Sequence, residues 1–246
     1  MSKVDAATVE RIIIEVLRRL EPGNTPIENL SSYIEHTLLR PDTVPEQIDH
    51  LCVEAKKHIF YAVCVPPRYV QHAKDHLNGS AVKVVSVVGF PHGAALTSTK
   101  RAEAESLVEI GVDEVDMVLP IGALKAGDWR AVAADISAVV GVAHRNDAPQ
   151  PLVKVILETA LLTDREIVAA CIIAQDCGAD FVKTSTGFNG SGATVDHVVL
   201  MRQTIGESMG IKAAGGIRLR EHAESLIRAG ATRIGTSSGP ALLTPN

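Results

Sequence analysis

Long hydrophobic runs and an excess of basic charge are both missing from this sequence. The longest apolar runs, such as AVKVVSVVGF at 81–90, are far too short to cross a bilayer, and the charged N-terminus does not resemble a signal peptide. A net charge of -5, from 24 basic and 29 acidic side chains, gives no reason to expect a nucleic-acid partner. We therefore expect a cytoplasmic protein without a membrane partner.

Cysteine motifs and nucleotide-binding motifs are also missing. The four cysteines (Cys52, Cys64, Cys171 and Cys177) show neither a C-x-x-C spacing nor histidines at zinc-finger intervals, so no disulfide framework or structural metal is expected. No GxGxxG or GxxxxGK[ST] follows the first predicted strand. His36 lies in a strand without a second ligand at a suitable spacing, which favours a structural hydrogen bond. We expect neither a metal nor a cofactor.

What the sequence does contain is a regular alternation of short apolar strands and amphipathic helices. Eight strands are predicted, within 33–39, 61–65, 82–90, 114–119, 152–158, 180–186, 211–216 and 233–238. Alternating strands and helices give a parallel sheet, and strands that are nearly continuous in Val, Ile, Leu and Ala are typically covered on both faces. We predict an α/β protein with a single (β/α)8 TIM barrel as its catalytic domain over 29–246. An open doubly wound sheet is the alternative.

One more helix is predicted ahead of this domain. Apolar residues recur at helical spacing over 5–20, and Pro22 and Gly23 end the pattern. We assign residues 1–28 to an N-terminal helical extension, which can serve as an interface or cover the bottom of the barrel.

Four charged residues interrupt the predicted buried strands, namely Asp116, Lys154, Lys183 and Lys212. Active sites of such barrels form at the carboxyl ends of the strands, so charged residues there are candidate site residues. The three lysines follow one another at intervals of 29 residues, on successive strands, and can share one pocket. A single lysine of this kind could instead reach solvent at the end of its strand.

Lysines that share a desolvated pocket have a chemical consequence. Two ammonium groups close together disfavour the charged form of at least one of them and lower its pKa. A neutral amine is a nucleophile that can attack a carbonyl and form a Schiff base. Asp116 can then transfer protons, although a carboxylate that only pairs with a lysine is the alternative.

Glycine and serine are concentrated after the last two predicted strands, in AAGGIR at 213–218 and IGTSSG at 234–239. Glycines let backbone N–H groups approach an anion, and the hydroxyls of Ser237 and Ser238 can donate further hydrogen bonds. Such segments are also common turns and helix caps. Their joint position after strands seven and eight favours a phosphate site.

Eight ordered segments resemble the deoxyribose-phosphate aldolase family: IEHTLL (34–39), VCV (63–65), VVGFPHGA (87–94), EVDMVLPIGALK (114–125), LVKVILET (152–159), DFVKTSTGF (180–188), GIKAAGGIR (210–218) and GTSSG (235–239). The resemblance implies a class I aldolase that uses a lysine Schiff base. Such an enzyme cleaves 2-deoxy-D-ribose 5-phosphate reversibly into acetaldehyde and D-glyceraldehyde 3-phosphate. The resemblance also implies a homodimer or a larger homo-oligomer.

The resemblance assigns roles to individual residues. Lys183 would be the Schiff-base lysine, Lys212 the neighbour that lowers its pKa, and Asp116 the proton carrier. Substrate and phosphate contacts would come from Cys64, Lys154, Thr186, Gly187, Gly215, Gly216, Gly235, Ser237 and Ser238. Two alternatives remain: a sugar-phosphate-binding barrel without catalysis, and a Schiff-base aldolase for a longer phosphorylated sugar.

Four positions depart from the family's pattern. Glu35 replaces an aspartate, Pro66 and Pro120 replace asparagines, and Phe188 stands where some members have a basic residue. Each proline removes a side-chain amide and a backbone donor. Phe188 predicts a phosphate held with less positive charge. Glu35, Pro66 and Pro120 motivate the alternative without catalysis.

Overall fold

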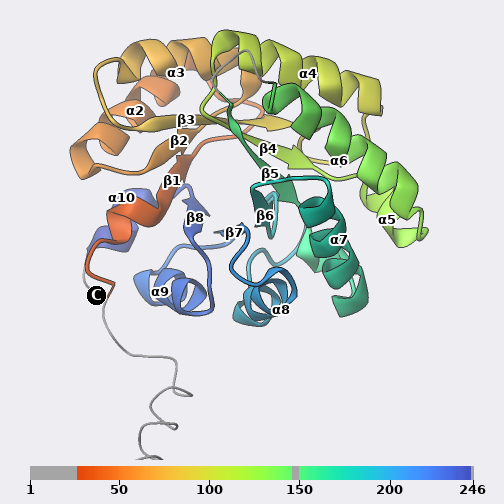
Figure 1. Cartoon of the computed structure of the whole chain (residues 1–246). Coiled ribbons are helices and arrows are strands. Elements are labelled where there is room, and N and C mark those ends of the chain that lie inside the picture. Colours follow the sequence, from red (N-terminus) through yellow and green to blue (C-terminus); the bar gives the residue numbers. More distant parts are fainter. Residues whose placement is uncertain (1–26, 146–149, 245–246) are drawn as a thin grey trace, which may run out of the picture.

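Eight parallel strands close into a barrel in the computed structural model, which describes residues 27–145 and 150–244 (Figure 1). The strands are β1 (Ile34–Thr37), β2 (Ala62–Cys64), β3 (Lys83–Val88), β4 (Glu114–Val118), β5 (Leu152–Ile156), β6 (Phe181–Lys183), β7 (Gly210–Ala214) and β8 (Arg233–Thr236). Each strand pairs with its neighbours in the chain, and β1 also pairs with β8. The β1–β8 pairing confirms the predicted TIM barrel and excludes the open sheet.

Helices form a ring around the strands (Figure 1). The main helices are α2 (Pro45–His58), α3 (Val70–Leu77), α4 (Thr97–Ile110), α6 (Trp129–Ala143), α7 (Asp164–Asp176), α8 (Val195–Ile205) and α9 (Arg220–Arg228). Shorter elements are α5 (Ile121–Lys125), α10 (Gly239–Leu243) and the 3-10 helices η1 (Leu30–Tyr33), η2 (Pro67–Tyr69) and η3 (Thr159–Leu161). Local sequence sets the boundaries: α7 begins with a capping box of Thr163 and Glu166, and Gly111 ends α4 with a φ of 81°.

The strands separate the hydrophobic core, between strands and helices, from the interior of the barrel. Val115 and Met117 of β4 belong to the large hydrophobic core between the strands and the helices. Asp116 lies between them, and since side chains alternate across a strand it points to the opposite face, into the barrel. Lys212 has the same position between Ile211 and Ala213 of β7. The fold therefore places charged side chains inside the barrel while its outer face is apolar.

The N-terminal helix predicted over 5–20, with most of the extension 1–28, lies outside the described residues and stays a prediction. Within the described ranges, no helix combines the length and the hydrophobicity that crossing a bilayer requires.

Candidate active site

A cluster of six charged side chains lies in the interior of the barrel. Its members are Glu35 from β1, Glu114 and Asp116 from β4, Lys154 from β5, Lys183 from β6 and Lys212 from β7, all of them buried. Asp116 lies at its centre: its carboxylate oxygens are 2.9 Å from Nζ of Lys154, 2.7 Å from Nζ of Lys183 and 2.6 Å from Nζ of Lys212. The structure thus brings together the four charged residues that the sequence analysis singled out.

The three lysines differ in how many carboxylates they contact. Nζ of Lys154 lies 2.5 Å from Glu114 and 3.6 Å from Glu35 as well as contacting Asp116. Lys212 also has a second partner, because Glu35 accepts a hydrogen bond from it. Lys183 pairs with Asp116 alone among the described residues. The positive charge of Lys183 is therefore the least compensated of the three.

This difference separates the pKa values of the lysines. Burial lowers the pKa of Lys183, and neighbouring Lys212 lowers it further, while Asp116 only partly opposes the two. Burial also lowers the pKa of Lys212, but Asp116 and Glu35 outweigh this effect and raise the pKa. Burial also disfavours the charged form of Lys154, but three carboxylates outweigh it and raise its pKa well above that of an ordinary lysine. Lys183 is thus the lysine that most readily becomes a neutral amine, and burial contributes more to this than the neighbouring cation emphasised in the sequence analysis.

The lysines in turn shift the pKa of the central carboxylate, Asp116. Burial alone would raise the pKa of Asp116, but the ammonium groups of Lys154, Lys183 and Lys212 together hold it well below its usual range. Asp116 is therefore ionised at neutral pH, and its Oδ2 accepts hydrogen bonds from Lys183 and Lys212.

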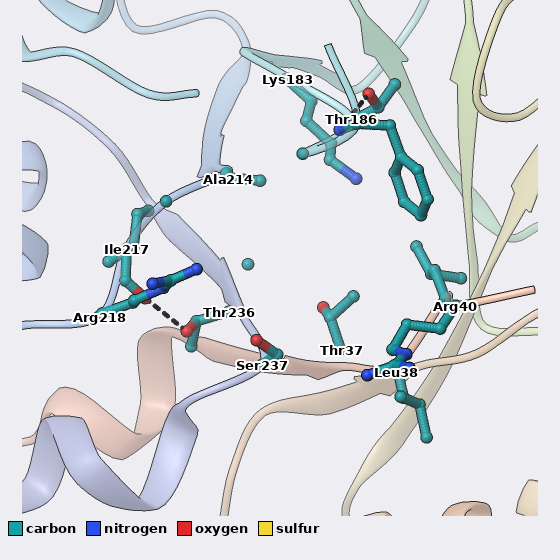
Figure 2. A pocket seen from close by; sticks show the side chains of 16 residues that line it. Thr37, Leu38, Arg40, Lys183, Thr186, Ala214, Ile217, Arg218, Thr236 and Ser237 are labelled. Atoms are coloured by element: carbon teal, nitrogen blue, oxygen red, sulfur yellow. Dashed lines mark hydrogen bonds between the residues drawn. The ribbon is translucent and has the colours of Figure 1, made fainter. Parts of the chain in front are cut away.

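Lys183 also lines a cavity of about 360 Å³. The lining residues are Thr37, Leu38, Leu39, Arg40, Lys183, Thr186, Gly187, Phe188, Ala214, Gly215, Gly216, Ile217, Arg218, Gly235, Thr236 and Ser237. Figure 2 shows Lys183 and Arg218 reaching toward the space that these residues surround. Lys154 and Lys212 do not line this cavity. A small molecule in it would meet the amine of Lys183.

One side of the cavity is suited to an anion. Gly215 and Gly216 have φ values of 92° and 72°, a left-handed conformation that favours glycine and turns the chain tightly after β7. Arg218 follows on the same loop, exposed and without a hydrogen bond or ion pair to any described residue, whereas Arg40 is held by Asp42 at 2.6 Å. Ser237 lines the same cavity. The sequence analysis missed Arg218, although AAGGIR places an arginine directly after the glycine pair.

The other predicted substrate contacts fall into two groups. Those that line the cavity are Thr186, Gly187, Gly215, Gly216, Gly235 and Ser237. Cys64, Lys154 and Ser238 do not line it. Cys64 is buried, which raises the pKa of its thiol to about 11, and the backbone N–H of Ser238 already donates to Oγ1 of Thr236. A Cβ on Gly235 would lie 3.0 Å from Cε of Lys212, so the missing side chain leaves room for that lysine.

The four departures from the family pattern lie in different places. Glu35 reaches Lys212 and Lys154, so the longer side chain is accommodated within the charged cluster. Pro66 lines a neighbouring cavity of about 540 Å³, and Pro120 precedes α5; neither lines the cavity of Lys183. Phe188 does line it and packs edge to face against Phe90 at 5.2 Å between ring centroids.

A buried glutamate, Glu158, anchors one wall of the cavity. Its carboxylate accepts hydrogen bonds from the backbone N–H of Thr186 at 3.2 Å, from the Thr186 hydroxyl, and from Nδ2 of Asn189 at 3.1 Å. Thr186 in turn accepts a hydrogen bond from the N–H of Phe188. Glu158 itself has a φ of 60°, which a non-glycine residue rarely adopts. It therefore holds the segment after Lys183, a role that the sequence analysis did not foresee even though LVKVILET contains the residue.

Known proteins are similar to this chain in sequence and in the arrangement of their elements. Residues 33–243 match the model of the DeoC/LacD family of aldolases. The chain is 51% identical to a deoxyribose-phosphate aldolase of Brevibacillus brevis, over 88% of this chain and 96% of that protein. It is 52% identical to a deoxyribose-phosphate aldolase of Streptococcus gordonii, over 87% and 95% of the two chains. A tetrameric deoxyribose phosphate aldolase of Aeropyrum pernix superimposes with a TM-score of 0.80 and 34% identity, over 87% of this chain and 89% of that one. The chain therefore belongs to the DeoC/LacD family of aldolases.

Proposed function

We propose that this aldolase cleaves 2-deoxy-D-ribose 5-phosphate reversibly into acetaldehyde and D-glyceraldehyde 3-phosphate, with Lys183 as the Schiff-base lysine. One observation carries the choice of residue: of the three lysines in the charged cluster, Lys183 alone both lines the cavity and has a single carboxylate partner. The curated relatives in Brevibacillus brevis and Streptococcus gordonii, each about half identical over most of the chain, support the choice of substrate.

The reaction begins at the aldehyde carbon of the open-chain sugar. The neutral amine of Lys183 attacks C1, and loss of water from the carbinolamine leaves an iminium that can accept electrons. The C3 hydroxyl then loses its proton, the bond between C2 and C3 breaks, and its electron pair forms an enamine on the two-carbon fragment. Protonation of C2 and hydrolysis release acetaldehyde and restore the amine. The three-carbon product retains the phosphate.

Asp116 and Lys212 support these proton transfers. Oδ2 of Asp116 lies 2.7 Å from Nζ of Lys183, within reach for moving protons to and from the carbinolamine, directly or through one water. Lys212 contacts the same oxygen at 2.6 Å and keeps the carboxylate in place. In this assignment Lys154 holds Asp116 from its other oxygen, at 2.9 Å, and does not reach the substrate.

The phosphate is assigned to the loops after β7 and β8, with contacts from Gly215, Gly216, Ser237 and Arg218. Arg218 supplies positive charge on the same cavity as Phe188, so the phosphate would meet a cation there although Phe188 itself is uncharged. Arg40 lines the cavity as well but is already paired with Asp42.

Replacement of Arg218 by alanine should weaken recognition of the phosphate specifically. A hydrogen bond to a charged group contributes about 1.5–3 kcal/mol, so KM for the phosphorylated sugar should rise by roughly 10- to 100-fold. Steady-state kinetics on unphosphorylated 2-deoxyribose should change little, and Arg130→Ala, an exposed arginine that does not line the cavity, provides the matched control. An equal loss on both sugars would contradict the assignment.

Replacement of Glu158 by glutamine should loosen the cavity wall without removing the nucleophile. The neutral amide keeps the size of the side chain but weakens the two hydrogen bonds that Thr186 donates to the carboxylate, and we expect a stability loss of about 1–3 kcal/mol. KM should rise more than kcat falls, because the charged cluster around Lys183 stays intact. Denaturant unfolding and steady-state kinetics check this, with the exposed Glu207→Gln as control. An unchanged KM would remove Glu158 from the positioning of Thr186.

Product analysis separates this function from its two alternatives. The purified chain is incubated with 2-deoxyribose 5-phosphate, and acetaldehyde is measured with a coupled alcohol dehydrogenase. Binding without acetaldehyde would favour a sugar-phosphate-binding barrel. Faster cleavage of a longer phosphorylated sugar, measured in parallel, would favour an aldolase of different specificity.

We also propose that the chain forms a homodimer or a larger homo-oligomer. The Aeropyrum pernix relative is described as tetrameric, and its fold superimposes on most of this chain. Multi-angle light scattering at working concentrations tests the proposal, and a mass of one chain, 26.1 kDa, would reject it.

A cytoplasmic location completes the proposal. Cys52, Cys64, Cys171 and Cys177 are free thiols, the state that a reducing compartment maintains. Fractionation of the source cells, with activity recovered outside the cytoplasmic fraction, would argue against this location.

A further inference from the structure

We propose that Asp49, His72 and His76 form a binding site for a divalent transition-metal ion on the outer surface of the barrel, between α2 and α3. Asp49 lies on α2, and the two histidines lie on α3. None of the three residues lines the cavity of Lys183, and the aldolase mechanism uses none of them. The sequence analysis considered only His36 as a metal ligand and did not notice the spacing H-x-x-x-H in VQHAKDHL.

Local structure brings the two histidines together. Residues four apart on a helix share one face, so His72 and His76 project from α3 side by side, with ring centroids 4.8 Å apart. Oδ1 of Asp49, on the facing helix, lies 2.6 Å from Nε2 of His72 and 3.0 Å from Nε2 of His76. One carboxylate oxygen thus contacts both rings.

The spacing of these atoms fits a single ion. One ligand atom from each residue can be chosen so that all three lie within 4.8 Å of one another. Two ligands about 2.0–2.1 Å from a tetrahedral Zn²⁺ are roughly 3.3 Å apart. The two distances from Asp49 to the histidines, 2.6 Å and 3.0 Å, are somewhat shorter than that value, so the side chains have to rotate slightly apart to bind an ion.

The exposure of the site allows an ion to enter and water to complete its coordination. The side chains of Asp49, His72 and His76 are 40%, 36% and 38% exposed. Two imidazoles with one carboxylate suit Zn²⁺, Co²⁺, Ni²⁺ and Cu²⁺ better than Mg²⁺ or Ca²⁺, which prefer oxygen ligands. Lys56, whose ammonium donates to the backbone carbonyl of His76 at 2.8 Å, is the nearby positive charge that opposes binding.

The same geometry has a simpler explanation, in which Asp49 only accepts hydrogen bonds from two histidines and links the helices. The two explanations differ in charge. Two neutral imidazoles and one carboxylate carry a net charge of -1, which a dication compensates. Metal binding also requires both rings to be unprotonated. Metal binding should therefore link α2 to α3 and stabilise the folded chain by mass action.

The test is calorimetric titration of the chelator-treated full chain with ZnCl₂ at pH 7.5. We expect one Zn²⁺ per chain and a higher thermal midpoint when Zn²⁺ is in excess. Affinity should fall at least tenfold in His72→Ala, in His76→Ala and in Asp49→Asn, the last of which keeps the shape of the side chain but removes its charge. Cobalt absorption spectra, in which tetrahedral and octahedral sites differ in intensity, provide a second readout on the same proteins.

His50→Ala is the matched control, because His50 faces Glu54 on the same helix at 3.5 Å but belongs to no group of three ligands within the described part of the chain. It should bind Zn²⁺ like the original chain. Aldolase turnover should be the same in all of these variants, which keeps this test separate from that of the proposed function. Absence of Zn²⁺ binding, or binding that persists unchanged in His72→Ala and His76→Ala, would overturn the proposal.

Discussion

Replacement of Lys183 by alanine should reduce turnover by roughly 10⁴- to 10⁶-fold, as is typical when a covalent nucleophile is removed. Alanine cannot form an iminium, and neither remaining lysine can replace it. Lys154 and Lys212 do not line the cavity, and carboxylates raise the pKa of both. The residual rate should be measured on protein purified free of any host aldolase.

The same variant tests the covalent step directly. Borohydride reduction in the presence of 2-deoxyribose 5-phosphate should leave a stable adduct on Lys183, located by peptide mass mapping, and none in Lys183→Ala. Lys125→Ala, which removes a half-exposed lysine that does not line the cavity, should be trapped like the original chain. An adduct on Lys154 or Lys212 would require the roles of the lysines to be reassigned.

Stability distinguishes loss of the nucleophile from loss of the fold. The lowered pKa means that folded Lys183 holds its proton less tightly than the unfolded chain does. Its charge therefore costs stability most at pH values below its folded pKa, and progressively less as the pH rises toward the pKa of the unfolded chain. Lys183→Met, which keeps most of the length of the side chain but carries no charge, should be at least as stable as the original chain at pH 7 and still inactive.

Replacement of Asp116 by asparagine should damage both stability and catalysis. Three buried ammonium groups share this carboxylate, and breaking a buried ion pair by removing one partner typically costs about 3–5 kcal/mol. Loss of proton transfer should lower kcat by about 10²- to 10⁴-fold. Asparagine preserves the shape of the side chain, so the losses of stability and turnover would result from the missing negative charge.

The acid side of the stability profile provides a further readout of Asp116. Because its folded pKa lies below that of the unfolded chain, its ionised form contributes stability above roughly pH 4, and this contribution is lost as the pH falls through the folded pKa. Denaturant unfolding from pH 7 down to pH 3 should show a smaller acid-dependent loss in Asp116→Asn than in the original chain.

Asp135→Asn is the matched control for this variant. Asp135 is buried and pairs with Lys100 at 2.5 Å, away from the cavity. It should lose stability in a similar way, yet its folded fraction should turn over at the original rate. If Asp116→Asn kept more than a tenth of the original kcat, Asp116 would be a structural counter-charge and not the proton carrier.

Periodicity was sufficient to predict the fold. The eight apolar runs became β1 to β8 because each is too apolar to face water and too short for a helix, and the intervening amphipathic segments became the helices that cover them. The 29-residue spacing of Lys154, Lys183 and Lys212 predicted that the lysines come from neighbouring strands. Their register follows from the pairing of the strands, which sets Lys183 directly beside Lys212.

Contacts between distant parts of the chain could not be predicted in this way. Tyr61 donates a hydrogen bond to Glu114, which in turn pairs with Lys154, and no local pattern links these three residues. In the sequence, nothing distinguishes Arg218 from the other arginines. In the folded chain it lines the cavity that the loops after β7 and β8 surround. In the sequence, Glu158 is an ordinary glutamate at the end of a strand, and only the tertiary structure shows its hydrogen bond with Thr186.

The sequence by itself determined that this protein is an α/β barrel with lysines inside, because hydrophobic periodicity and unusual charges are local properties. The tertiary structure decided which lysine we propose as the nucleophile. Carboxylates from β1 and β4 surround Lys154 and Lys212, whereas Lys183 has one such partner and borders the cavity. The physical reason is that a pKa depends on burial and on the charges within a few ångströms, and closure of the barrel sets both.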